Sequence, residues 1–128
     1  MNHNRMLTIS SLLSILLLTL HVTDDIVRGI SKPEPANLAL LVLVVWLYGT
    51  LLLADRRSGH IIMLLGSLGA PGVLALHMSG AGLVGGRIAN SSGIFFWVWT
   101  LLALGATGAF SAVLAARGLW SMQRGRSR

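Results

Sequence analysis

Two histidines and two neighbouring aspartates are the residues of this chain best suited to bind a ligand or a metal ion. The octapeptide His21-Val22-Thr23-Asp24-Asp25-Ile26-Val27-Arg28 ends one long apolar run, and His77 lies near the end of another. Ionisable groups are costly inside apolar segments, so they indicate a functional site. Imidazole and carboxylate groups spaced by three or four residues share one face of a helix and can ligate a divalent ion. The candidate binding residues are therefore His21, Asp24, Asp25, Arg28 and His77, and the candidate metal ligands are His21, Asp25 and His77.

The composition indicates that the chain is embedded in lipid. Hydrophobic residues make up 54% of its 128 residues, and charged residues make up only 11%. Soluble domains carry about 25% charged residues, and the mean hydropathy here is +0.75. A water-soluble fold of this length has too small an interior to hide that much apolar surface.

The charge and the missing cysteines exclude several kinds of function. The formal net charge is +6, but the basic residues lie between the apolar runs and form no continuous patch, so nucleic acid is not an expected partner. The chain has no cysteine. This excludes disulfides, thiolate metal sites and cysteine nucleophiles.

Four apolar segments predict four membrane-spanning helices, at about residues 6–28, 36–54, 61–84 and 94–116. Each is close to the ~20 residues that cross the hydrocarbon core as a helix, and none alternates as a strand would. Short polar breaks separate them, so consecutive helices are expected to be antiparallel neighbours. The predicted fold class is an all-α integral membrane four-helix bundle. Residues 1–128 would form a single transmembrane domain with a basic tail at 117–128.

The distribution of basic residues predicts the orientation. Seven arginines fall on one side of the predicted bundle and three Lys or Arg residues on the other, which favours a multi-pass cell-membrane protein with both termini cytoplasmic. Trp97 and Trp99 would then be interfacial anchors on the outer side, and Trp120 on the inner side. Trp46 and Tyr48 fall near the middle of the membrane and are expected to pack between helices.

The two key histidines are predicted to reach the same depth. At ~1.5 Å per residue, His21 lies roughly 22 Å along its helix and His77 roughly 24 Å along a parallel one. One stripe of the first helix is polar and should face protein; it comprises Ser11, Ser14, Leu18, His21, Asp25 and Arg28. His3 is expected to be solvated, and His60 to lie at the inner interface.

Several interpretations of the outer polar cluster remain open. It can be a structural cap, in which the acids pair with Arg28 and His77 is a hydrogen-bonded core histidine. It can be a divalent metal site, with water or Glu34 as a fourth ligand. It can also hold a haem between His21 and His77, with Gly80 and Ala81 making room and Arg28 and Arg87 meeting the propionates.

Transport and catalysis find less support in the sequence. No acid lies at mid-depth in any segment, which disfavours proton-coupled export but leaves transport of a small solute open. The few carboxylates disfavour lipid head-group chemistry. The leading hypothesis is a non-catalytic binding or assembly subunit whose outward-facing cluster recognises a ligand, ion or partner. Its small-residue seam would serve a membrane partner or a second copy and comprises Gly105, Gly108, Ala109 and Ala112.

Overall fold

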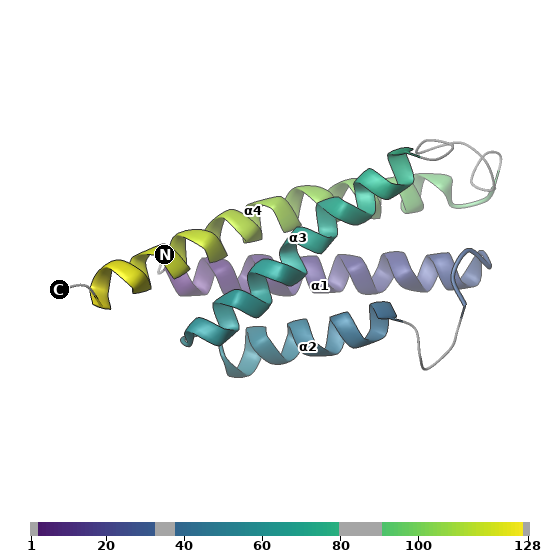
Figure 1. Ribbon diagram of the computed structural model, residues 1–128. Coiled ribbons are helices and arrows are strands. Elements are labelled where there is room, and N and C mark those ends of the chain that lie inside the picture. Colours follow the sequence, from purple (N-terminus) through teal and green to yellow (C-terminus); the bar gives the residue numbers. More distant parts are fainter. Residues whose placement is uncertain (1–2, 33–37, 80–90, 127–128) are drawn as a thin grey trace.

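The computed structural model describes residues 3–32, 38–79 and 91–126, which contain four α-helices and no strand. The helices are α1 (His3–Val27), α2 (Leu38–Leu52), α3 (Arg57–Ser79) and α4 (Ile94–Arg126). In Figure 1, α1 and α3 run away from the chain ends, and α2 and α4 run back towards them. We call the end that holds both termini the terminal end, and the other the loop end.

Three of the four helices are long and apolar enough to cross a membrane, namely α1, α3 and α4. The fourth, α2, has 15 residues and is about 22 Å long, less than the ~30 Å hydrocarbon core. The prediction for this segment began at residue 36, which lies outside the described residues. The described part of α2 ends at Leu52, just before a turn in which the Arg56 amide donates to the Leu53 carbonyl at 2.9 Å.

Two helices extend further than the sequence analysis expects. In α4 the helix continues to Arg126, so most of the predicted tail is helical. Arg124 lies over the ring of Trp120 at 4.6 Å, a cation–π contact that spans one turn. In α3 the helix begins at Arg57, within the predicted loop. The first turn of α3 therefore carries His60 into the interior.

The expectations for the two histidines at the terminal end are wrong. His3 is only half-exposed, and its Nε2 donates to the Leu114 carbonyl at 3.0 Å. His60 is fully buried. Both differ from the prediction because α1 starts at His3 itself and packs along α4, which covers this end of the bundle.

The surface is apolar and much of the interior is polar, the reverse of a soluble protein. Large hydrophobic side chains are exposed on all four helices, including Phe95 at 79% and Leu76 at 73%. The buried polar residues include Ser10, Ser11, Ser14, His21, Asp25, Thr50, His60, Ser67, Thr100 and Ser111. Such an arrangement suits a lipid environment, where hydrocarbon covers the outside and polar groups must find partners inside. The predicted inward stripe of α1 is confirmed from Ser11 to Asp25, where its residues are buried, while Arg28 at its end is half-buried.

A small hydrogen-bonded group fixes α2 against α1. The Trp46 indole donates to the Ser11 hydroxyl at 2.7 Å, and this hydroxyl lies 2.8 Å from the Thr50 hydroxyl. Trp46 is buried, as predicted. Tyr48 is 52% exposed, so its predicted packing is wrong. Tyr48 follows Trp46 by two residues, so its side chain points away from the helix face on which Trp46 is buried.

Glycines of α4 allow close contact with α3. A Cβ on Gly108 would lie 2.4 Å from the Ala70 Cβ and 2.9 Å from the Ser67 carbonyl oxygen. Pro71 lies inside α3 and has no amide hydrogen, so this Ser67 carbonyl lacks its usual helical partner. Gly105 packs against Leu74 in the same way.

The seam predicted from the small residues is thus an interface within the chain. Ala112 is buried and Ala109 is exposed. An oligomer through this seam stays a prediction, since α3 covers Gly105 and Gly108 but leaves Ala109 exposed.

Substitution of Gly108 by alanine tests this interface. Because the added methyl group meets backbone and Cβ atoms that cannot rotate away, Gly108→Ala should destabilise the fold by about 1–3 kcal/mol. Gly69→Ala is the matched control, since a Cβ there meets nothing within 4 Å. Unfolding in detergent, followed by circular dichroism, measures both variants. Equal stability of the two would contradict the described packing.

Candidate metal centre

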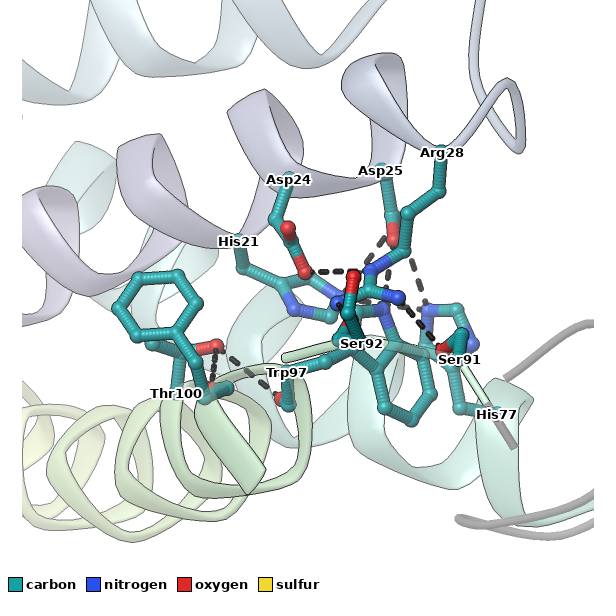
Figure 2. Close-up of polar contacts among 10 residues, drawn as sticks. His21, Asp24, Asp25, Arg28, His77, Ser91, Ser92, Trp97 and Thr100 are labelled. Carbon is teal, nitrogen blue, oxygen red and sulfur yellow. Dashed lines mark hydrogen bonds and ion pairs between the residues drawn. The ribbon is translucent and has the colours of Figure 1, made fainter. Parts of the chain in front are cut away.

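Three side chains that can ligate a metal converge at the loop end of the bundle. His21 and Asp25 lie one turn apart on α1, and His77 reaches them from the last turn of α3 (Figure 2). The His21 Nε2 is 3.4 Å from the His77 Nε2 and 3.6 Å from the Asp25 Oδ2. The His77 Nε2 is 3.9 Å from the same carboxylate oxygen. The three predicted metal ligands are therefore close enough to share one ion.

The local sequence explains why Asp25 lies in the last turn of α1. Gly29 adopts a left-handed φ of 68°, which glycine accepts without strain and which commonly ends a helix. Its amide donates to the Ile26 carbonyl at 3.0 Å, and the Ile30 amide donates to the Asp25 carbonyl at 2.8 Å. The carbonyls of Asp25 and Ile26 in the last turn are thus satisfied, and the Asp25 side chain stays on the inward stripe.

Trp97 of α4 completes the centre. Its indole Nε1 donates to the Asp25 Oδ1 at 2.8 Å, which leaves Oδ2 facing the histidines. The Trp97 ring also contacts both imidazoles, with centroid distances of 5.4 Å to His21 and 4.9 Å to His77. The expectation that Trp97 is an interfacial anchor is wrong, because its side chain is only 1% exposed. Trp99, two residues on, is 60% exposed.

The role of Trp97 had a signal in the sequence. Trp97 lies on the same face of α4 as the buried small residues, because steps of three or four residues connect them. The series is Ala115, Ser111, Gly108, Leu104, Leu101 and Trp97. All of these are buried. The same series does not include Trp99. The pattern places Trp97 on the packed face, but it cannot say that Asp25 is its partner.

The other two candidate residues form a separate network. The Arg28 Nε donates to the Asp24 Oδ2 at 2.8 Å. The same guanidinium donates to the Ser91 hydroxyl at 2.7 Å and to the Ser92 carbonyl at 3.0 Å. These bonds join the end of α1 to the residues just before α4 (Figure 2). Asp24 and Asp25, adjacent in sequence, therefore have different partners and face different surroundings.

Among the three side chains of the candidate metal centre, burial decreases from His21 through Asp25 to His77. The side chain of His21 is 1% exposed, that of Asp25 12% and that of His77 25%. His77 is therefore the most exposed of the three side chains. The Nδ1 of His21 is buried and has no hydrogen-bond partner among the described residues. A neighbouring pocket has a volume of about 470 Å³ and is lined by Asp24, Val27, Arg28, Ser92, Gly93 and Phe96.

The geometry does not favour a haem between the histidines. The two imidazoles meet edge to face, with ring centroids 5.3 Å apart, and Trp97 packs on both of them. A porphyrin would have to separate the two Nε2 atoms and displace the indole. The residues expected to make room for it and to meet its propionates, Gly80, Ala81 and Arg87, lie outside the described residues, as does Glu34.

No protein-family model, curated protein or solved structure matches this chain. The function is therefore inferred from the geometry of its own side chains.

The hydrogen bond from Trp97 to Asp25 can be tested by Trp97→Phe. The variant keeps an aromatic ring but leaves a buried carboxylate oxygen without its donor, so the free energy of unfolding should fall by about 1.5–3 kcal/mol. Trp99→Phe, on the exposed side of the same helix, should change it by less than about 0.5 kcal/mol. Chemical unfolding in detergent gives both values. A Trp97→Phe variant as stable as Trp99→Phe would show that the bond contributes nothing.

Proposed function

We propose that this chain is an integral membrane protein that binds a divalent transition-metal ion, with Zn²⁺ the best fit. The ligands would be the Nε2 atoms of His21 and His77 and the Oδ2 of Asp25. The observation that carries the proposal is the convergence of these three atoms, from two helices, with every pair between 3.4 and 3.9 Å apart.

These separations suit tetrahedral coordination. Zinc binds imidazole nitrogen and carboxylate oxygen at about 2.0–2.1 Å, which puts neighbouring ligands of a tetrahedron about 3.4 Å apart. Neighbouring ligands of an octahedral ion at the same bond length are only about 2.9 Å apart. The observed spacings are close to the tetrahedral value, so small side-chain movements would complete the three-ligand face. A water molecule or an incoming ligand would take the fourth position.

The surrounding residues support the role of Asp25 as a ligand. Metal-binding groups are usually oriented by a second set of hydrogen bonds. Trp97 supplies such a bond to Oδ1 and so directs Oδ2 to the histidines. Asp24 lacks this arrangement, because its Oδ2 accepts from Arg28 instead.

The apolar surface supports a transmembrane setting for this site. We place α1, α3 and α4 across the bilayer, with the segment around α2 as a fourth, antiparallel crossing. Both termini would be cytoplasmic, which puts the metal site near the outer face. His77 would then exchange its ion with the outer solution, and the chain would act by binding rather than catalysis. A membrane partner that uses the bound ion is part of this proposal.

Metal binding can be measured on the purified chain by competition with a fluorescent Zn²⁺ chelator. The wild type should bind one equivalent at the outer site. His77→Ala and Asp25→Asn should each weaken this binding at least about tenfold, because each removes a ligand. Asp24→Asn is the matched control and should bind as the wild type does. If Asp25→Asn and Asp24→Asn bind equally well, Asp25 is not a ligand and the proposed site is wrong.

Single-cysteine labelling tests the proposed orientation, and the absence of native cysteine makes it direct. In intact cells, an impermeant maleimide should label Ser92→Cys, at the loop end. It should label Ser121→Cys, near the end of α4, only after the membrane is opened. The reverse pattern would overturn the orientation, and labelling of both in intact cells would overturn the shared side of the two termini.

A further inference from the structure

The pocket beside the candidate metal centre contains one negative and one positive side chain. Asp24 and Arg28 of α1 line it, and their side chains are only 17% and 14% exposed. Its volume of about 470 Å³ is in the range of small-molecule sites. The rest of the lining consists of Val27 and of three residues at the start of α4, namely Ser92, Gly93 and Phe96. We call this recess, which has no net charge, the charged pocket.

Both charged side chains keep hydrogen-bonding capacity that the described residues do not use. A guanidinium has five N–H groups, and Arg28 donates to the Asp24 Oδ2, the Ser91 hydroxyl and the Ser92 carbonyl (Figure 2). Two of its hydrogens, one on each Nη, therefore have no partner within residues 3–32, 38–79 and 91–126. The Asp24 Oδ1 has no partner there either. The pair can thus bind an anionic and a cationic group at the same time.

A second pocket, which we call the apolar pocket, lies between α1 and α4 further from the loop end. It has a volume of about 380 Å³, and its lining comprises Met6, Ile9, Ser10 and Leu13 of α1 and Ala106, Thr107 and Phe110 of α4. Its two hydroxyl groups donate to carbonyls of their own helices, so its surface is chiefly apolar. It offers a place for hydrocarbon rather than for a polar ligand.

The two pockets lie on the same faces of α1 and α4. On α1, steps of three or four residues lead from Leu13 to Asp24, and on α4 they lead from Phe96 to Phe110. Ala106 follows Phe96 by ten residues, or about 15 Å along the helix. This length is about half of the ~30 Å hydrocarbon core, which is the depth of one leaflet. The spacing therefore matches a phospholipid with its head group in the charged pocket and an acyl chain over the apolar pocket.

The surface beside the charged pocket is suited to the membrane interface. Val27 is 79% exposed, and the exposed rings of Phe95 and Trp99 stack with their centroids 6.4 Å apart. Aromatic side chains gather at the level of the lipid head groups. The charged pocket is thus bordered by side chains that lipid would cover.

The charge balance selects the class of lipid. Arg28 attracts a phosphate, but Asp24 repels a head group that carries net negative charge. The phosphate of phosphatidylethanolamine can accept from Arg28, and its primary ammonium can donate to Asp24. The ring of Phe96 lines the same pocket and can interact with the ammonium through its face. A choline head group has no N–H to donate, and a glycerol head group has no cation.

We infer that the charged and apolar pockets between α1 and α4 bind one phosphatidylethanolamine molecule. Arg28 holds the phosphate, the Asp24 Oδ1 accepts from the ammonium, and an acyl chain lies over the apolar pocket. The inference rests on the transmembrane placement proposed above, but it requires no metal ion. Failure of the zinc site would leave it intact.

Native mass spectrometry of the full-length chain in detergent micelles tests the head-group part of this inference. The probes are dioleoyl phosphatidylethanolamine, phosphatidylcholine and phosphatidylglycerol. The wild type should retain one phosphatidylethanolamine and bind it at least about tenfold more tightly than phosphatidylglycerol, because a charged hydrogen bond is gained. Asp24→Asn should reverse this preference, since the pocket then has the net positive charge of Arg28.

Asp25→Asn is the matched control, because it should keep the lipid preference of the wild type while it loses zinc. A reversed preference also differs from a folding defect, which would weaken the binding of every lipid. Equal retention of the three lipids by the wild type, or an unchanged preference in Asp24→Asn, would overturn the inference. Competition by soluble phosphoethanolamine at the same concentration as the lipid would show that no acyl chain is needed, and it would overturn the lipid as the occupant.

An alanine on the exposed lining tests the position of the acyl chain. Ala106→Phe should fill the apolar pocket and weaken binding of the dioleoyl lipid at least about fivefold, while short-chain dihexanoyl phosphatidylethanolamine should bind as it does to the wild type. Ala116→Phe, at an exposed position of α4 outside both pockets, is the control. If the two variants bind the dioleoyl lipid equally well, the acyl chain does not lie over the apolar pocket and the proposed placement is wrong.

Discussion

The buried carboxylate of Asp25 is the constraint on which the loop end of this structure depends. A carboxylate inside an apolar bundle must be matched by donors or cations, because lipid offers none. Trp97 meets one of its oxygens from α4, and the two histidines face the other from α1 and α3. Three helices are thereby tied at one residue, and the same requirement that stabilises the fold brings together the three side chains of the proposed metal site.

The two adjacent aspartates have different partners because of helix geometry. Successive residues point about 100° apart on a helix, so Asp25 faces the interior while Asp24 turns towards Arg28. The Arg28 bonds to Asp24, Ser91 and Ser92 hold the end of α1 against the start of α4. This network fixes the end of α1 beside the candidate metal centre, and within residues 3–32, 38–79 and 91–126 its arginine is bonded to Asp24 and not to Asp25.

Between the loop end and the terminal end, the interior of the bundle holds both hydroxyl groups and apolar side chains. Ser67 and Ser111 are buried there and share a hydrogen bond, and Leu18, Ala70 and Leu104 are buried between the His21–His77 pair and His60. They separate His21 and His77 from His60.

The sequence alone determined the helical class, the apolar surface and the inward stripe of α1, because these follow from composition and from the 3.6-residue period. The sequence also predicted that His21 and His77 reach a similar depth, with Asp25 one turn from His21, because depth along a helix follows from residue number. Tertiary structure decided the rest. The partner of Asp25 is Trp97, 72 residues away, and His60 is buried because α4 continues as a helix past it. Such pairings depend on which helix faces are pressed together, a property of the packed bundle that no local pattern contains.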